Sequence, residues 1–158
     1  MKKQKGFSLI ELLIVVAIIL IIAAIAIPNL LKSRIAANEA SAVGSVRTLN
    51  TAQVTYSNLC QVYSPDLVSL NTGGGCVAAA NIIDVSLATG SKSGYNFDTV
   101  TPGTTPAGTN TTTFDVHALP ITINVSGNRA FCSNQGLVIH YNLAGAACNP
   151  LPGTDPVL

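Results

Sequence analysis

The hydrophobic pattern begins with an apolar run, Phe7–Ile27, in which Glu11 is the single charged residue. As a helix, these residues would span about 31 Å at 1.5 Å per residue, which matches the hydrocarbon thickness of a bilayer. Three lysines stand directly before the run: Lys2, Lys3 and Lys5. Because cationic flanks stay on the cytoplasmic side, the pattern predicts one membrane-spanning helix with a cytoplasmic N-terminus and the rest of the chain outside.

The helical pattern continues beyond the apolar run to about Asn58. Apolar residues recur at spacings that keep one helix face apolar. They are Leu31, Ile35, Ala42, Val46, Leu49 and Tyr56. The pattern predicts one long helix over about residues 8–58, half of it in the membrane and half packed on a globular head. Pro28 lacks the N–H that would bond to the Ala24 carbonyl, so a kink is expected there.

After Gly94 the spacing changes from helical to alternating, which is typical of an antiparallel sheet covered on one face. Three segments would each point apolar side chains to one side: Tyr95 and Phe97; Phe114, Val116 and Ala118; Leu137, Ile139 and Tyr141. Arg129–Cys132 is a fourth candidate strand. The predicted fold class is therefore α+β, with the long helix packed on a C-terminal antiparallel sheet of about four strands.

Between the long helix and the sheet, the pattern predicts two short helices. Ser64 as N-cap with Pro65 in the first turn favours a helix ended by Gly73. A second short helix is expected over residues 81–88. The threonine-rich segment 99–113 has too little apolar surface to pack, so we expect an exposed loop there.

Composition narrows the class of protein. The chain has 158 residues, of which 9% are charged, with a formal net charge of +1. This length suits one domain with a membrane segment. Phosphate binding needs clustered lysine and arginine, and the basic residues after the first six are dispersed. We therefore predict no binding of nucleic acid.

The sequence shows no pattern of catalytic residues, so we predict no enzymatic activity, no cofactor and no metal. His117 and His140 fall opposite the apolar faces of their strands and are expected to face solvent or another subunit. A calcium ion held by Asp84, Asp98 and Asp115 is an alternative, but these residues lack the spacing of an EF-hand loop.

Four cysteines in a membrane-targeted chain indicate disulfides in an oxidising compartment. They are Cys60, Cys76, Cys132 and Cys148, and reduced thiols are the alternative. Of the three possible connectivities, we favour Cys60–Cys76 and Cys132–Cys148. Each bridge would close a short, turn-rich loop, worth roughly 3 kcal/mol on the chain-entropy model.

Glu11 is unusual because a carboxylate inside an apolar helix costs roughly 2.5–3.5 kcal/mol on insertion scales. Residues typical of a signal-peptide cleavage site do not follow the apolar run, and Gly6, before the run, is the plausible processing point. Cleavage there would create an amine at Phe7, and the amine of a neighbouring subunit would be a suitable partner for Glu11. Alternatively, Glu11 lies in the headgroup region of a simple membrane anchor.

The segment KQKGFSLIELLIVVAII, residues 3–19, resembles the class III leader and N-terminal helix of type IV pilins and the related pseudopilins. The resemblance implies a pilin fold, cleavage by a prepilin peptidase between Gly6 and Phe7, and N-methylation of Phe7. It also implies that Glu11 aligns subunits during filament assembly. The implied regions are a leader over 1–6, a membrane and assembly segment over 7–28, and a head over 29–158 that includes the amphipathic half of the helix.

The favoured function is a structural subunit of a type IV pilus, held in the inner membrane by a single pass and then polymerised into an extracellular filament for adhesion and motility. Its implied partners are identical subunits in a helical homopolymer, the prepilin peptidase and the pilus assembly machinery. One alternative is a pseudopilin of type II secretion. An alternative of another class is a periplasmic binding domain with a single-pass membrane anchor, which would not be cleaved at Gly6.

Overall fold

The longest element is helix α1, Leu9–Cys60, which agrees with the predicted helix over 8–58. The computed structural model describes residues 7–74, 76, 81–100, 112–143, 145, 148 and 155–158. The chain divides into two compact units, Met1–Arg34 and Ile35–Leu158. In the first unit, α1 continues through Pro28. The kink expected at Pro28 remains a prediction.

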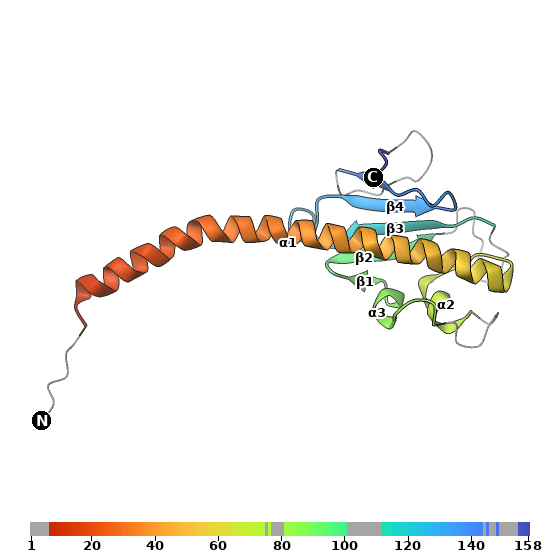
Figure 1. The fold of residues 1–158 in the computed structure, drawn as a ribbon, viewed down its shortest axis with the longest axis horizontal. Coiled ribbons are helices and arrows are strands. Elements are labelled where there is room, and N and C mark those ends of the chain that lie inside the picture. Colours follow the sequence, from red (N-terminus) through yellow and green to blue (C-terminus); the bar gives the residue numbers. More distant parts are fainter. Residues whose placement is uncertain are drawn as a thin grey trace, which may run out of the picture. The chain divides into compact units, whose positions relative to one another are not determined.

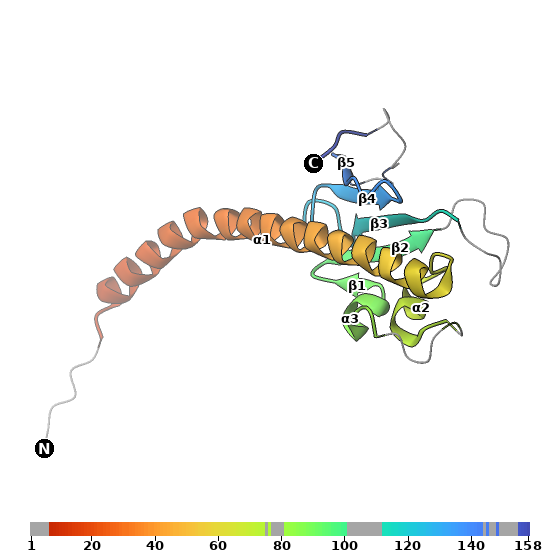
Figure 2. The ribbon, with the colours of Figure 1, turned by 45° about the vertical axis from the view of Figure 1, so that its right-hand side comes forward.

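In the second unit, α1 packs on a sheet whose five strands follow one another in chain order. The strands are β1 Ser91–Lys92, β2 Tyr95–Val100, β3 Asp115–Pro120, β4 Ala130–Asn134 and β5 His140–Asn142. All neighbouring strands are antiparallel. The later, orange-to-yellow part of α1 crosses one face of this sheet (Figure 1, Figure 2). The predicted α+β class and the packing of a long helix on an antiparallel sheet are confirmed.

The core lies between α1 and the covered face of the sheet. The helix contributes Ala42, Val46, Leu49 and Tyr56, all of which are buried. The sheet side contributes Tyr95, Phe97, Phe114, Val116, Ala118 and Phe131. The apolar spacing that predicted the amphipathic half of the helix and the alternation that predicted the strands therefore identify the two sides of one core.

The strand count and the last strand differ from the prediction. The sheet has five strands instead of about four, because Ser91–Lys92 forms a two-residue hairpin strand with Tyr95 and Asn96. Leu137 is half exposed at a positive φ of 60°, so it does not point into the core. The last strand begins only at His140.

The two short helices differ from the prediction: the first lies slightly later in the chain and has another N-cap, and the second is shorter. In α2, Leu67–Thr72, Asp66 is the N-cap and accepts a hydrogen bond from the Ser69 N–H. Ser64, predicted to be that cap, is instead buried against α1. As predicted, the helix ends at Gly73, which has a φ of 93°.

Helix α3 spans only Val85–Ala88, with Asp84 as N-cap. Residues 81–84, which were predicted to be helical, are not part of it. In Figure 1, α2 and α3 lie beyond the β1 edge of the sheet. Of the expected threonine-rich loop, Thr99 belongs to β2 and is buried, whereas residues 101–111 lie outside the described residues.

Candidate functional site

The first turn of α1 contains the residues with predicted assembly roles. Phe7 is 84% exposed and precedes the helix, which starts at Leu9. The Ser8 N–H donates to Glu11 Oε2 at 2.9 Å. A serine before a helix and a glutamate three residues later form part of a capping box, in which the carboxylate satisfies an N–H that the helix leaves unpaired. Gly6, on the other side of the predicted cleavage point, lies outside the described residues.

This cap gives Glu11 a local structural role that the sequence reasoning missed. The pattern Ser8-Leu9-Ile10-Glu11 ahead of an apolar run is a recognised start signal for a helix. Glu11 is itself exposed, so its carboxylate remains accessible to a further partner. The arrangement is therefore compatible with both a helix cap and a contact to another subunit.

The helix that follows Glu11 leaves its apolar surface uncovered. Every residue from Phe7 to Ile22 is exposed. The most apolar 18-residue window of α1 has a mean hydropathy of 3.3 and is 0% buried, so this helix is long and apolar enough to cross a membrane. Soluble monomers rarely expose apolar surface on this scale, because its hydration is unfavourable. The segment therefore needs lipid or other apolar helices around it.

Further along, a carboxylate joins α1 to the sheet. Glu39 is 7% exposed, and its Oε1 accepts hydrogen bonds from the N–H groups of Asn128 and Arg129 at 2.9 and 3.2 Å. Its Oε2 lies 2.8 Å from both Nε and Nη2 of Arg129. The Arg129 guanidinium also lies over the rings of Phe131 and Tyr141, at 5.5 and 5.6 Å from their centroids. We call Glu39 and Arg129 the helix–sheet clamp.

The clamp was not predicted, although Glu39 interrupts the apolar face of the helix between Ile35 and Ala42. A charged residue at such a position usually has a partner. Nearby, the Tyr95 hydroxyl donates to the Arg129 carbonyl at 2.7 Å. Burial, assisted by the Glu39 carboxylate, raises the pKa of Tyr95 above its usual value.

Two disulfides tie the ends of the head. Cys60, the last residue of α1, is joined to Cys76, and Cys132 of β4 is joined to Cys148. Both bridges close loops with a sequence separation of 16. The first bridge connects the end of the long helix to the segment after α2, and the second connects the C-terminal part of the chain to the sheet.

The two histidines differ in their surroundings. His117 is half-buried on β3, opposite Asp98 and Cys132 in the register. His140 is 8% exposed, so the prediction that it faces solvent or another subunit is wrong. It is covered because the C-terminal residues return beside β5: His140 pairs with Val157, and its Nδ1 lies 2.9 Å from the Asp155 carbonyl oxygen.

The possible calcium ligands do not form a cluster. Asp84 caps α3 and forms an ion pair with Lys92 at 3.1 Å. Within the described part of the chain, the one group of three potential ligands close enough to share an ion is Cys132, Cys148 and Asp155. Its two sulfurs are already joined to each other, so they do not offer thiolate ligands.

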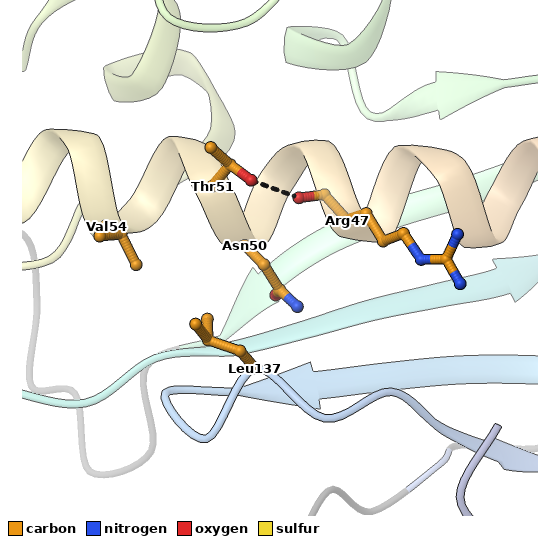
Figure 3. Close-up of a pocket in the computed structure, with 5 residues that line it drawn as sticks. All are labelled: Arg47, Asn50, Thr51, Val54 and Leu137. Atoms are coloured by element: carbon orange, nitrogen blue, oxygen red, sulfur yellow. Dashed lines mark hydrogen bonds between the residues drawn. The ribbon is translucent and has the colours of Figure 1, made fainter.

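A shallow pocket of about 340 Å³ lies on the head between α1 and the turn after β4. Figure 3 shows Asn50 and Val54 of α1 directed toward Leu137, with Arg47 alongside. Asn50 Nδ2 donates to Ser133 Oγ at 2.8 Å, which joins this part of the helix to β4. The pocket offers one cation, an apolar wall and the Thr51 hydroxyl, which donates to the Arg47 carbonyl at 3.0 Å, and no carboxylate is among its lining residues.

Comparisons with known proteins concern the N-terminal region. Residues 1–27 match the family described as the prokaryotic N-terminal methylation motif. The chain is 45% identical over 62 residues to the "Type IV major pilin protein PilA" of Myxococcus xanthus, and 64% identical over 39 residues to the "Type IV wide pilus major component PilA4" of Thermus thermophilus. The N-terminal region is therefore similar to that of type IV pilins. The resemblance inferred from the sequence is thereby confirmed.

The pilin likeness covers only part of each chain. The two matches span 39% and 25% of this chain, and 28% and 30% of the relatives. A "Fimbrial protein" of Pseudomonas aeruginosa is 56% identical over 52 residues, which is 33% of this chain and 34% of the relative. The chain thus aligns with about a third of the length of these pilins. No solved structure matches the chain.

Proposed function

We propose that this chain is a structural subunit of a type IV pilus, stored in the inner membrane and polymerised into an extracellular filament. The observation that carries the proposal is the fully exposed apolar segment from Phe7 to Ile22, attached by one helix to a packed, disulfide-tied head. Such a segment fits two environments in turn, lipid before assembly and a core of identical helices afterwards. The relatives named as pilins and as a fimbrial protein support the same function.

In this proposal, a prepilin peptidase hydrolyses the bond between Gly6 and Phe7, and the new Phe7 amine is methylated. The family motif over residues 1–27 supports this step. Cleavage before the apolar run leaves the membrane segment in the mature chain, which an ordinary signal peptidase would not do. The pilus assembly machinery then draws subunits from the inner membrane into the filament.

Glu11 has the second proposed role, the alignment of one subunit with the next. An exposed carboxylate within an apolar helix costs roughly 2.5–3.5 kcal/mol to insert, so pairing with the Phe7 amine of a neighbouring subunit would favour the filament over isolated helices in lipid. The capping hydrogen bond from Ser8 engages one carboxylate oxygen. It therefore also orients the side chain at the start of the helix.

A pair of variants tests whether the charge of Glu11 drives assembly. Glu11→Gln keeps an oxygen that can accept the Ser8 N–H but removes the charge, and Glu11→Ala removes both. We expect both variants to remain in the inner membrane and to reduce the filament yield at least tenfold. A tenfold change corresponds to a loss of only ~1.4 kcal/mol in the free energy of assembly. Normal filament yield from Glu11→Gln would show that Glu11 acts as a cap and not as a charge partner.

A deletion strain tests the pilus against the pseudopilin alternative. A pilus subunit predicts the loss of surface filaments and of motility on surfaces, with secretion intact. Accumulation of secreted proteins in the periplasm, with filaments unaffected, would favour the type II secretion role.

A further inference from the structure

The loop between β3 and β4, residues 121–129, exposes three branched aliphatic side chains. Ile121, Ile123 and Val125 are 53%, 48% and 54% exposed. Gly145 lies against the Ile123 side chain. Leu143, two residues before Gly145 in the chain, is also exposed, at 72%. Single exposed aliphatic residues are common, but three at alternate positions of one short loop give that loop an apolar surface that needs an explanation.

Four backbone N–H groups of the β3–β4 loop are paired within the loop itself. The Asn124 N–H donates to the Gly127 carbonyl at 3.0 Å, and the N–H groups of Val125 and Ser126 donate to the Thr122 carbonyl at 3.2 and 2.9 Å. The Thr122 N–H donates to Ser126 Oγ at 3.0 Å. A segment that enters an apolar environment must pair its polar backbone internally, because lipid offers no hydrogen bonds. The loop meets that requirement at these four groups.

The position of the loop is fixed by contacts to α1 and to the β1–β2 turn. Asn38 Nδ2 donates to the Ser126 carbonyl at 2.8 Å, and the Ile121 N–H donates to the Gly94 carbonyl at 3.0 Å. The loop therefore lies beside the part of α1 that contains Asn38. Asn38 follows Ile27, the last residue of the apolar run, by eleven residues. That stretch measures about 16 Å as a helix and at most about 40 Å when fully extended.

Charge also favours contact with lipid at this end. Residues 121–128 contain no charged side chain. Lys32 and Arg34, both exposed, lie in the stretch that leads from the apolar segment to Asn38, and cations at a membrane surface are attracted to anionic headgroups. The nearby carboxylate of Glu39 is already paired with Arg129, so it adds no unpaired negative charge.

We propose that the β3–β4 loop docks on the outer surface of the phospholipid bilayer while the chain is stored in the membrane, placing Ile121, Ile123 and Val125 at the boundary between headgroups and acyl chains. The proposal rests on the membrane-stored stage of the proposed function. The covalent tether keeps the loop near the bilayer, so even a modest apolar surface is sufficient for docking. Extraction of a subunit into a filament would have to break this contact.

The absence of tryptophan from the chain allows a direct test. The full-length chain carrying Ile123→Trp is reconstituted in phosphatidylcholine–phosphatidylglycerol vesicles, with and without lipids brominated near the headgroup. The matched control is Val68→Trp, on α2. Val68 is 55% exposed, and α2 contacts α1 near Tyr56, about 27 Å along the helix from Asn38.

We expect about a twofold loss of emission in brominated vesicles for Ile123→Trp and little change for Val68→Trp, because only the first indole would lie at the headgroup boundary. Val125→Trp is a second loop variant, at a position about as exposed as Ile123. It is included because a tryptophan at position 123 could misfold the loop through its contact with Gly145. Quenching of either loop variant above the control supports the proposal.

Equal emission in the two kinds of vesicle for both loop variants overturns the proposal. An indole emission that shifts to the blue only in assembled filaments also overturns it, and would assign the loop to a contact with a second copy of the chain. Flotation of the vesicles distinguishes a failure of loop docking from a failure of the chain to enter the membrane. A chain that floats without quenching refutes loop docking alone, whereas a chain that does not float refutes membrane storage as well.

Discussion

Replacing Glu39 by alanine removes three hydrogen bonds and an ion pair that join α1 to the segment just before β4. Two of the hydrogen bonds come from the backbone N–H groups of Asn128 and Arg129, the third comes from Arg129 Nε, and Arg129 Nη2 makes the ion pair. Breaking a buried ion pair on one side costs about 3–5 kcal/mol. The Arg129 side chain is 36% exposed and can recover part of its hydration, so we expect a loss of about 2–4 kcal/mol in the free energy of unfolding.

Urea unfolding of the full-length chain in detergent measures this loss. Near-UV circular dichroism of the tyrosines reports on the core, and Tyr95 lies beside the clamp. With a slope of about 2 kcal/mol per molar urea, the midpoint should fall by roughly 1–2 M. Glu39→Gln is the matched control, since its amide oxygen can still accept from the two backbone N–H groups, whereas the charge and the acceptor that faces the Arg129 guanidinium are lost. It should cost about half as much.

Two outcomes would refute this reasoning. If Glu39→Ala changes stability by less than about 0.5 kcal/mol, which is typical of a surface substitution, the clamp does not stabilise the packing of helix on sheet. If Glu39→Gln is as destabilising as Glu39→Ala, the backbone hydrogen bonds contribute nothing and the charge alone matters.

Two further predictions concern the disulfides and the acid sensitivity of the head. The paired substitutions Cys132→Ser and Cys148→Ser should lower the free energy of unfolding by about 3 kcal/mol, measured in urea; a variant as stable as the parent would show that the loop was already ordered without the bond. The hydrogen bond from Ser86, with those from Leu87 and Lys92, lowers the pKa of Asp84 to about 2 from its ordinary 3.8. The ionised Asp84 carboxylate therefore contributes to the free energy of unfolding above pH 4, and this contribution is lost as the pH falls toward 2. Asp84→Asn should therefore reduce the difference in stability between pH 5 and pH 2, by less than about 1 kcal/mol because the side chain is 53% exposed, and an unchanged difference would contradict this explanation.

Much of the fold could be predicted because long periodic segments dominate it. The apolar spacing of α1 and the alternation of β2 and β3 each extend over enough residues to indicate both the type of element and its buried face. The two-residue strand β1 carries no such pattern. Only its pairing with β2 across the Ser93–Gly94 turn makes it a strand.

Local signals failed where a distant contact decided the outcome. Ser64 and Asp66 are both good N-cap residues on either side of Pro65. Gln53 of α1 exchanges two hydrogen bonds with the backbone of Ser64, which draws Ser64 into the core and leaves Asp66 to cap the helix. His140 is covered by the returning C-terminal residues for the same kind of reason.

The functional residues show the same contrast between local sequence signals and contacts between distant residues. The motif around Phe7 and Glu11 is contiguous in the chain and can be read directly from it. The clamp joins residues 90 positions apart, and their pairing depends on how α1 lies on the sheet. Sequence reasoning could have marked Glu39 as a buried charge that needs a partner, but Arg129 was one of several dispersed cations.

Mass spectrometry of the chain in filaments sheared from the cell surface tests the central claim most directly. The account predicts that the N-terminal peptide of the filament subunit begins at Phe7 and is heavier by one methyl group, with residues 1–6 absent. A filament subunit that still begins at Met1, or filaments that lack this chain altogether, would contradict it.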